Sequence, residues 1–206
     1  WWLAFLILTI AGERMELSRF LQPSRNARWT FIVVLMLIGA GLVGIAQSGG
    51  PRVFALGLLA LAAWLLRHDI ARKTVLQRGL TRFIAVCLLT GYAWLVVGAL
   101  VLLGAGTLVP GSASYDALMH ALGMGFVFSM VFGHAPIIFP AVLRVAVPYH
   151  PVFYLPLLLL HGALVVRLSG DALGHFGLLR WGALFGAVAL VAFIANTVAA
   201  VVRGRR

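Results

Sequence analysis

Three histidines, His120, His134 and His150, lie in one apolar, glycine-dotted stretch of the chain, residues 116–154. An imidazole buried in an apolar segment costs free energy unless it has a partner, so it marks either a site or an internal hydrogen bond. Histidine is also the commonest metal ligand in proteins. The stretch therefore favours a bound metal cofactor, haem first of all, with hydrogen bonding between helices as the alternative.

His120 and His134 are fourteen residues apart in the sequence. In an α-helix that separation is within about 40° of four full turns, so the spacing predicts that both rings lie on one helix face. The rise between them is about 21 Å, close to the thickness of the hydrocarbon layer. The pair thus predicts one histidine near each boundary of a membrane.

His161 is the best candidate for a second ligand opposite His120. His161 and His175 are also fourteen residues apart, but the run Ser169-Gly-Asp171 predicts a break between them, so we expect them on different segments. His161 instead lies within the span that follows His120. A tilt or shift of the two spans would bring His120 and His161 level as an axial pair for haem.

Three further residues complete this candidate haem site. Asp116, one turn before His120, is expected to accept the second ring proton of that histidine, as carboxylates do behind many metal ligands. Arg167 and Arg180 lie near the same predicted membrane surface and are suited to pair with haem propionates. A copper site formed by His134, His150 and a methionine is the second metal alternative.

Two family resemblances point the same way. The spacing of His120 and His134 resembles that of the haem-bearing helices of cytochrome b, where each helix supplies one ligand to each of two stacked haems; that match requires a second helix with a like pair. The run HALGMGFVFSMVF from His120 resembles the helix His-Gly-x-x-Met-x-Phe-Phe-x-x-Met-Pro of haem-copper oxidase catalytic subunits. That resemblance implies haem ligation at His120.

The oxidase resemblance extends to His150-Pro-Val-Phe-Tyr154, which is similar to the family's His-Pro-x-x-Tyr and implies a copper ligand at His150. The His-His copper pair and the late His-x-His helix of that family are absent from the sequence. The resemblance is confined to residues 116–154. A small membrane haem protein of the NnrS-like kind, associated with nitric oxide handling, is a related expectation, although the chain matches no motif of that family.

Composition determines the class of protein that positions these residues. The chain is 63% hydrophobic and only 10% charged, whereas soluble domains are about half apolar and about a quarter charged. The apolar residues form many long runs, so lipid is the expected solvent.

We predict an all-α polytopic integral membrane bundle, one transmembrane domain over residues 1–206, truncated at its start. About seven spans are expected, at residues 1–12 (the end of a span), 29–48, 52–67, 83–105, 115–139, 152–168 and 177–202.

Several boundaries of these spans are predicted from turn residues and charges. Residues 13–28 are polar and basic and are expected to form a loop, with an interfacial helical turn within it as the alternative. Pro136 and Pro140 are expected to kink or end the fifth span, since proline removes a backbone donor and clashes with the preceding turn. Residues 141–151 then form a connector. Gly39, Gly41 and Gly44 give the second span a small-residue face for close packing.

The distribution of cations predicts the orientation. Only Arg52, Arg167 and Arg180 lie on one side of the predicted spans, and thirteen cations lie on the other: Arg14, Arg19, Arg25, Arg28, Arg67, Arg72, Lys73, Arg78, Arg82, Arg144, Arg203, Arg205 and Arg206. Positive loops face the cytoplasm, so the C-terminus is expected there, in the cell (inner) membrane. The strong positive charge is explained this way and does not indicate nucleic acid.

Other functions are disfavoured by what the sequence lacks. Its only lysine, Lys73, is in a loop, which excludes a retinal pigment, and its carboxylates lie near span ends, which disfavours carboxylate-coupled proton transport. Its single cysteine, Cys87, excludes an internal disulfide.

We expect a protein that binds b-type haem in electron transfer or in handling nitric oxide or oxygen, in contact with lipid and with a redox partner. The alternative is a cofactor-free scaffold or assembly subunit, held to other membrane subunits by small-residue faces and residues 13–19.

Overall fold

The computed structural model describes residues 1–17 and 24–204, and every regular element in these residues is helical. Six helical segments are long and apolar enough to cross a membrane: Arg25–Val43, Gly50–His68, Gly79–Ala105, Ala113–Leu143, Pro151–Leu173 and Phe176–Gly204. The predicted all-α, multi-pass membrane class therefore agrees with the fold. The elements in order are α1 (Trp2–Leu17), α2 (Arg25–Val43), α3 (Gly50–His68), α4 (Ala71–Thr74), α5 (Gly79–Ala105), α6 (Ala113–His120), the π-helix η2 (Ala121–Val127), α7 (Phe128–Leu143), the 3-10 turn η3 (Pro151–Phe153), α8 (Tyr154–Leu173) and α9 (Phe176–Gly204).

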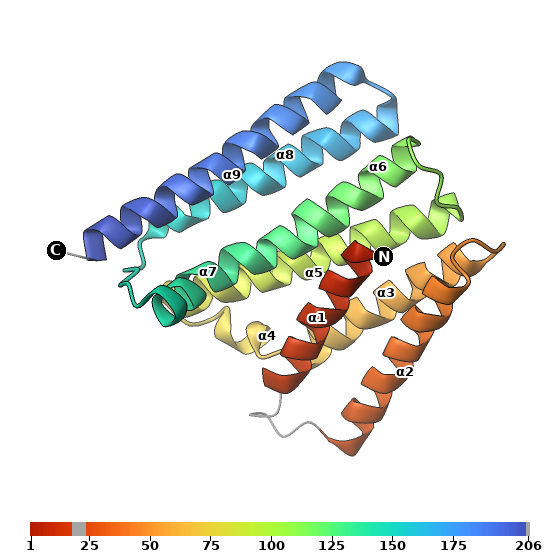
Figure 1. Ribbon diagram of the computed structural model, residues 1–206, viewed down its shortest axis with the longest axis horizontal. Helices are drawn as coiled ribbons and strands as arrows, with labels where there is room; N and C mark the ends of the chain where they lie inside the picture. Colours follow the sequence, from red (N-terminus) through yellow and green to blue (C-terminus); the bar gives the residue numbers. More distant parts are fainter. Residues whose placement is uncertain (18–23, 205–206) are drawn as a thin grey trace.

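The long helices run up and down beside one another, with α5 in the centre (Figure 1). On one side α5 packs against α3, which packs against α2, and on the other side against the continuous segment α6–η2–α7. The pair α8 and α9 forms the far edge of the bundle. From α2 onward, long helices that follow one another in the sequence pack mostly against each other, as in bundles with short connections.

α1 lies against the bundle through a single stripe of side chains. Ala4, Ile7, Ala11 and Arg14 are all buried, and their three- and four-residue spacing places them on one helix face. The helix contacts α3 and η2. It continues through Leu17, and α2 begins at Arg25, so both ends of the predicted loop at residues 13–28 are helical. The apolar stripe extends α1 past the charged pair at its end.

The two prolines of the fifth predicted span do not end it. Pro136 and Pro140 both lie inside α7. The helix ends only at Arg144, whose backbone has a positive φ of 54° and whose N–H bonds the Pro140 carbonyl at 3.0 Å. A proline removes one helix hydrogen bond, and membrane helices tolerate this where neighbouring helices pack against the site. Residues 144–150 then form the connector, which is shorter than the predicted 141–151 because α7 continues to Leu143 and η3 begins at Pro151.

The predicted break at Ser169-Gly-Asp171 is also wrong, since α8 runs through it to Leu173. The Ser169 hydroxyl donates to the Val165 carbonyl at 2.8 Å, as a serine within a helix does. A Cβ on Gly170 would lie 2.8 Å from the Leu179 backbone nitrogen, so this glycine permits close packing on α9. The turn falls at Gly174, with φ 62°, and His161 and His175 are on separate segments as expected.

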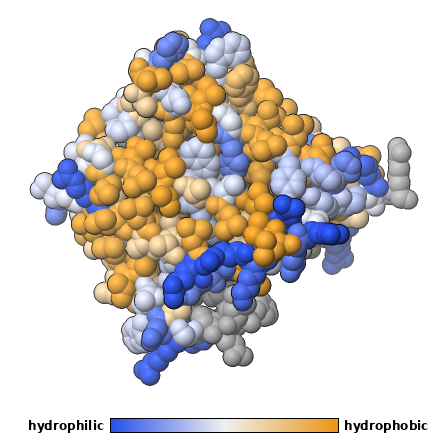
Figure 2. Space-filling view, turned by 180° about the vertical axis from the view of Figure 1, so that it is seen from behind, coloured by the Kyte–Doolittle hydropathy of each residue, from blue (hydrophilic) through white to orange (hydrophobic). Residues whose placement is uncertain are grey.

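Hydrophilic side chains form a band across the lower part of the molecule in Figure 2, beside broad apolar surface. The described members of the larger cation group lie at one end of the bundle, which we call the basic end. There α2, α4 and α5 begin, and α1, α3, α7 and α9 end. Arg19, Arg205 and Arg206, counted in the same group, lie outside the described residues.

The contact between α8 and α9 gives a test of the packing. A Cβ on Gly182 would lie 2.7–2.8 Å from the backbone nitrogen, Cα and Cβ of Arg167. Gly182→Ala is expected to push the two helices apart and to lower the thermal midpoint in detergent by about 2–8 °C, the range for an overpacked contact. The control is Gly162→Ala, because nothing lies within 4 Å of that position and alanine favours helix. Equal midpoints for the two variants would contradict the predicted contact.

Candidate polar sites at the two ends of the bundle

Two hydrogen bonds between charged side chains join α6 to α8. Asp116 Oδ2 accepts from Nη2 of Arg167 at 2.7 Å and from its Nε at 3.0 Å. The Asp116 side chain is 34% exposed and that of Arg167 18%. Nη1 of Arg167 also donates to the Leu179 carbonyl at 3.4 Å, which ties in the start of α9. Two bonds to one carboxylate fix both side chains more firmly than a single ion pair.

Local sequence places Asp116 for this contact. Ser112 caps α6, since its hydroxyl oxygen accepts from the Tyr115 N–H at 3.2 Å. Asp116 then lies in the first turn of the helix, where a negative charge is stabilised by the N-terminal end of the helix dipole. Arg167, which sequence reasoning assigned to haem propionates, has this carboxylate and a carbonyl as its partners instead.

His120 lies one turn further along α6. Its Nδ1 is 2.9 Å from the Asp116 carbonyl oxygen and 3.5 Å from Asp116 Oδ1. A carbonyl oxygen only accepts, so Nδ1 carries the proton and Nε2 of the neutral ring has the lone pair. No partner of Nε2 is found in the described part of the chain. The Nδ1 proton is donated to the backbone carbonyl of Asp116, while the predicted acceptor, the Asp116 carboxylate, binds Arg167.

His161 has the opposite tautomer. Nε1 of Trp94, on α5, donates to Nδ1 of His161 at 2.9 Å. Indole nitrogen is a donor only, so Nδ1 accepts and the neutral ring carries its proton on Nε2. That Nε2 is buried and has no partner among the residues described. In this arrangement His161 presents a buried N–H, whereas a metal ligand needs a lone pair at that atom.

The hydrogen bonds of the two proposed axial ligands therefore differ in direction. His120 bonds along its own helix, and His161 bonds to Trp94, which itself lies against Gly125 of the π-helix. Among the described residues, no hydrogen bond or ion pair joins the two histidines. Arg180, the other proposed propionate partner, is exposed in a groove of about 450 Å³ with Phe176 and Trp181.

At the basic end, His134 is held between α7 and α1. Its Nδ1 lies 2.6 Å from the Met130 carbonyl, so Nδ1 carries the proton and Nε2 accepts from Nη2 of Arg14 at 2.7 Å. The same Nη2 donates to Glu13 Oε1 at 2.7 Å. Arg14 is only 6% exposed. The lone pair of His134 is thus engaged by a buried guanidinium, a partner that sequence reasoning missed.

A π-helix separates His120 from His134. The one-face prediction used α-helical geometry throughout, but Ala121–Val127 forms i to i+5 hydrogen bonds. The turn angle per residue differs there, so the phase between the two rings differs from the α-helical value. Their partners are accordingly on different elements, α1 for His134 and α6 itself for His120.

Asp69 and Tyr92 form a second buried pair that the sequence did not reveal. Tyr92, fully buried on α5, donates to Asp69 Oδ2 at 2.7 Å, and the Ala71 N–H donates to Oδ1 at 2.8 Å. The carboxylate therefore holds the turn between α3 and α4 against α5. Its position at the end of an apolar run was visible in the sequence, but its partner, twenty-three residues away, was not.

His150 is exposed and acts as a cap. Its Nδ1 accepts from the Val152 N–H at 3.2 Å at the start of η3. With His134 bound to Arg14, the two histidines proposed for copper have separate partners. Within the described residues no group of three or more His, Cys, Asp or Glu side chains is placed to hold a metal ion.

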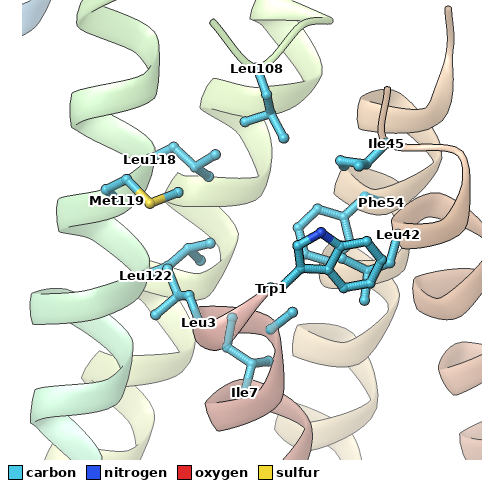
Figure 3. Close-up of a pocket in the computed structure, with 11 residues that line it drawn as sticks. Trp1, Leu3, Ile7, Leu42, Ile45, Phe54, Leu108, Leu118, Met119 and Leu122 are labelled. Carbon is cyan, nitrogen blue, oxygen red and sulfur yellow. The ribbon is translucent and has the colours of Figure 1, made fainter. Parts of the chain in front are cut away.

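An apolar cavity of about 200 Å³ is lined by none of these polar side chains. Figure 3 shows Trp1, Leu3 and Ile7 of the N-terminal segment facing Leu118, Met119 and Leu122 across it, with Leu42, Ile45, Phe54 and Leu108 completing the wall. No charged or titratable side chain lines it. Such a cavity suits an apolar occupant and carries no catalytic chemistry.

The six apolar helices, with charges paired at their ends, define a multi-pass helical membrane protein. The chain belongs to the family described as a domain of unknown function, DUF8744, whose model matches residues 1–202. No curated protein and no solved structure matches the chain.

The Asp116–Arg167 contact can be measured by a double-mutant cycle. Asp116→Asn and Arg167→Gln are each expected to destabilise the bundle, because each leaves a partly buried charge without its partner. The coupling free energy in detergent should be about 1–2 kcal/mol, reduced from that of a fully buried pair by the exposure of Asp116. Arg180→Gln, an exposed arginine without an ion pair among the described residues, serves as the control and should leave the midpoint unchanged. Additive single-variant effects would contradict the coupling.

Proposed function

We propose that this membrane protein binds haem b through His120 as its one axial histidine and handles a small gas such as nitric oxide or oxygen. The observation that carries the proposal is the hydrogen bond from His120 Nδ1 to the Asp116 carbonyl, which leaves the Nε2 lone pair free for iron. Haem iron with a single histidine keeps a coordination position at which a diatomic gas binds.

The i−4 hydrogen bond by itself does not distinguish His120. His134 and His68 make the same bond, to the carbonyls of Met130 and Trp64. However, Nε2 of His134 accepts from Arg14, and the ring of His68 stacks on Trp64 at a centroid distance of 4.7 Å. His68 is the last residue of the span Gly50–His68, whereas His120 lies inside the span Ala113–Leu143 and its Nε2 has no partner among the described residues.

The tautomer of His161 favours gas handling over electron transfer between two-histidine haems. Its Nε2–H is a donor and supplies no second axial lone pair. A buried donor of this kind is suited to a polar ligand atom. Arg167 remains committed to Asp116, and together they hold the backbone that orients His120; Arg180 is the free guanidinium for a propionate.

An optical spectrum of the purified protein tests the proposal. We expect a Soret band, a reduced-minus-oxidised b-type difference spectrum and about one iron per chain. His120→Ala should abolish the band, because it removes the ligand. His161→Ala should retain the band and alter the spectrum of the gas complex, because it removes only a donor.

The control for these variants is His175→Ala, since His175 is exposed in the turn before α9 and bonds only the local Leu178 N–H. Its spectrum should match that of the unaltered protein. A colourless protein without iron, or a normal spectrum in His120→Ala, would overturn haem ligation at His120. Metal analysis that finds copper in place of iron would favour the alternative site at His134 and His150.

A cofactor-free membrane subunit is the second candidate, and one observation favours it. The two buried arginines of the sites, Arg14 and Arg167, each have a carboxylate partner within the chain. These two guanidinium groups are then paired without a cofactor, and their role is to hold the bundle together. A colourless protein that co-purifies with a fixed membrane partner would support this candidate.

The orientation proposed for the protein places the basic end in the cytoplasm, in the cell (inner) membrane, with α1 as a seventh spanning segment. A reporter active only in the cytoplasm should then function at the C-terminus. The same reporter inserted after Gly111, between α5 and α6, should be inactive, and a periplasmic reporter should show the reverse. Cytoplasmic activity at Gly111 would contradict the orientation.

A further inference from the structure

A groove of about 590 Å³ opens at the basic end, between the start of α5 and the start of α8. Its volume lies within the range of about 300–1,000 Å³ that is usual for ligand sites. The wall consists of two arginines, two tyrosines and three small or apolar residues: Arg78, Arg82, Tyr149, Tyr154, Gly79, Val86 and Pro151. It is separate from the haem site proposed above, and the two can be tested independently.

The positive charges of this groove lack a negative partner. Arg78 and Arg82 are exposed and four residues apart, at the N-cap and in the first turn of α5. That turn contains no acidic residue, and neither arginine forms an ion pair with any described residue. Like charges at this spacing repel, and the positive end of the helix dipole adds to the repulsion. A bound anion would relieve both effects.

The tyrosines of the groove are held by a buried aromatic cluster. Phe83, only 1% exposed, has its ring centroid 5.2 Å from that of Tyr154 and 6.3 Å from that of Tyr149. Phe153, also buried, contacts both Phe83 and Tyr149. The cluster gives the groove a fixed wall. Tyrosine is typical of the boundary between headgroups and hydrocarbon.

The polarity of the groove changes along α5. Arg78 and Arg82 form its rim, and Val86, one turn further into the span Gly79–Ala105, lines its apolar end. A charged rim next to an apolar wall on a spanning helix matches the two parts of a phospholipid. Basic pockets between membrane helices on the positive side bind anionic headgroups by this arrangement.

We propose that this groove binds one anionic phospholipid, with its phosphate between Arg78 and Arg82 and an acyl chain along Val86. Guanidinium groups bind phosphate oxygens through two parallel hydrogen bonds, which adds to the charge attraction. The tyrosine hydroxyls at the rim supply neutral hydrogen bonds to the headgroup. The bound lipid would neutralise the start of α5 and cover the junction between α5 and α8.

Native mass spectrometry of the full chain in mild detergent tests the proposal. The protein is titrated with phosphatidylglycerol and, separately, with phosphatidylcholine of the same acyl chains. We expect one phosphatidylglycerol retained per chain and clearly weaker retention of phosphatidylcholine. In Arg78→Gln/Arg82→Gln the apparent affinity for phosphatidylglycerol should fall about twentyfold, since each basic residue beside an anionic headgroup contributes about a factor of five.

The matched control is Arg67→Gln/Arg72→Gln, which removes two exposed charges from the same end of the bundle outside the groove. It should retain phosphatidylglycerol as the unaltered protein does. Thr81→Glu supplies a carboxylate in the first turn of α5 and stabilises the helix start, so reduced lipid retention there cannot be attributed to misfolding.

Three results would overturn the proposal. The first is equal retention of the two lipids by the unaltered protein. The second is equal loss in the groove variant and its control, which would show a general charge effect. The third is displacement of phosphatidylglycerol by inorganic phosphate at the same concentration, which would show a free-anion site that makes no use of the acyl chain.

Discussion

Hydrocarbon offers no hydrogen bonds, so each polar group that enters the membrane must find its partner inside the protein. This constraint decides where the few charged residues of the chain lie and what they contact. Arg167 forms two bonds to Asp116, Arg14 lies between Glu13 and His134, and Tyr92 bonds Asp69. Each contact joins helices that apolar packing alone would leave free to slide, because interactions between apolar side chains have little directional preference.

The same constraint sets the chemistry of the histidines. A neutral imidazole has one donor and one acceptor, and the first partner determines which nitrogen carries the proton. The Trp94 indole makes Nδ1 of His161 an acceptor, and the Asp116 carbonyl makes Nδ1 of His120 a donor. Two histidines that look equivalent in the sequence therefore present a proton in one case and a lone pair in the other.

Much of the fold could be predicted from the sequence, and the errors have a common cause. Long apolar runs are sufficient to locate the spans, because lipid requires them wherever the backbone crosses. Pro136 and the run Ser169-Gly-Asp171 were expected to interrupt helices on local preference alone. In the structure packing overrides that preference: α7 continues past its prolines, and Gly170 allows α9 to approach closely. The π-helix at Ala121–Val127 has no local signal that would have indicated it.

The sequence by itself determined the class of protein, the approximate spans and the basic end, and it singled out Asp116, Arg167 and the histidines as candidate site residues. These follow from composition and from the positions of charges along the chain, which do not depend on how the helices pack. Only the tertiary structure decided which side chains meet: Arg167 with Asp116, Trp94 with His161, Arg14 with His134. Contacts of this kind depend on the order, rotation and depth of helices far apart in sequence, and a linear pattern of residue types does not contain those quantities.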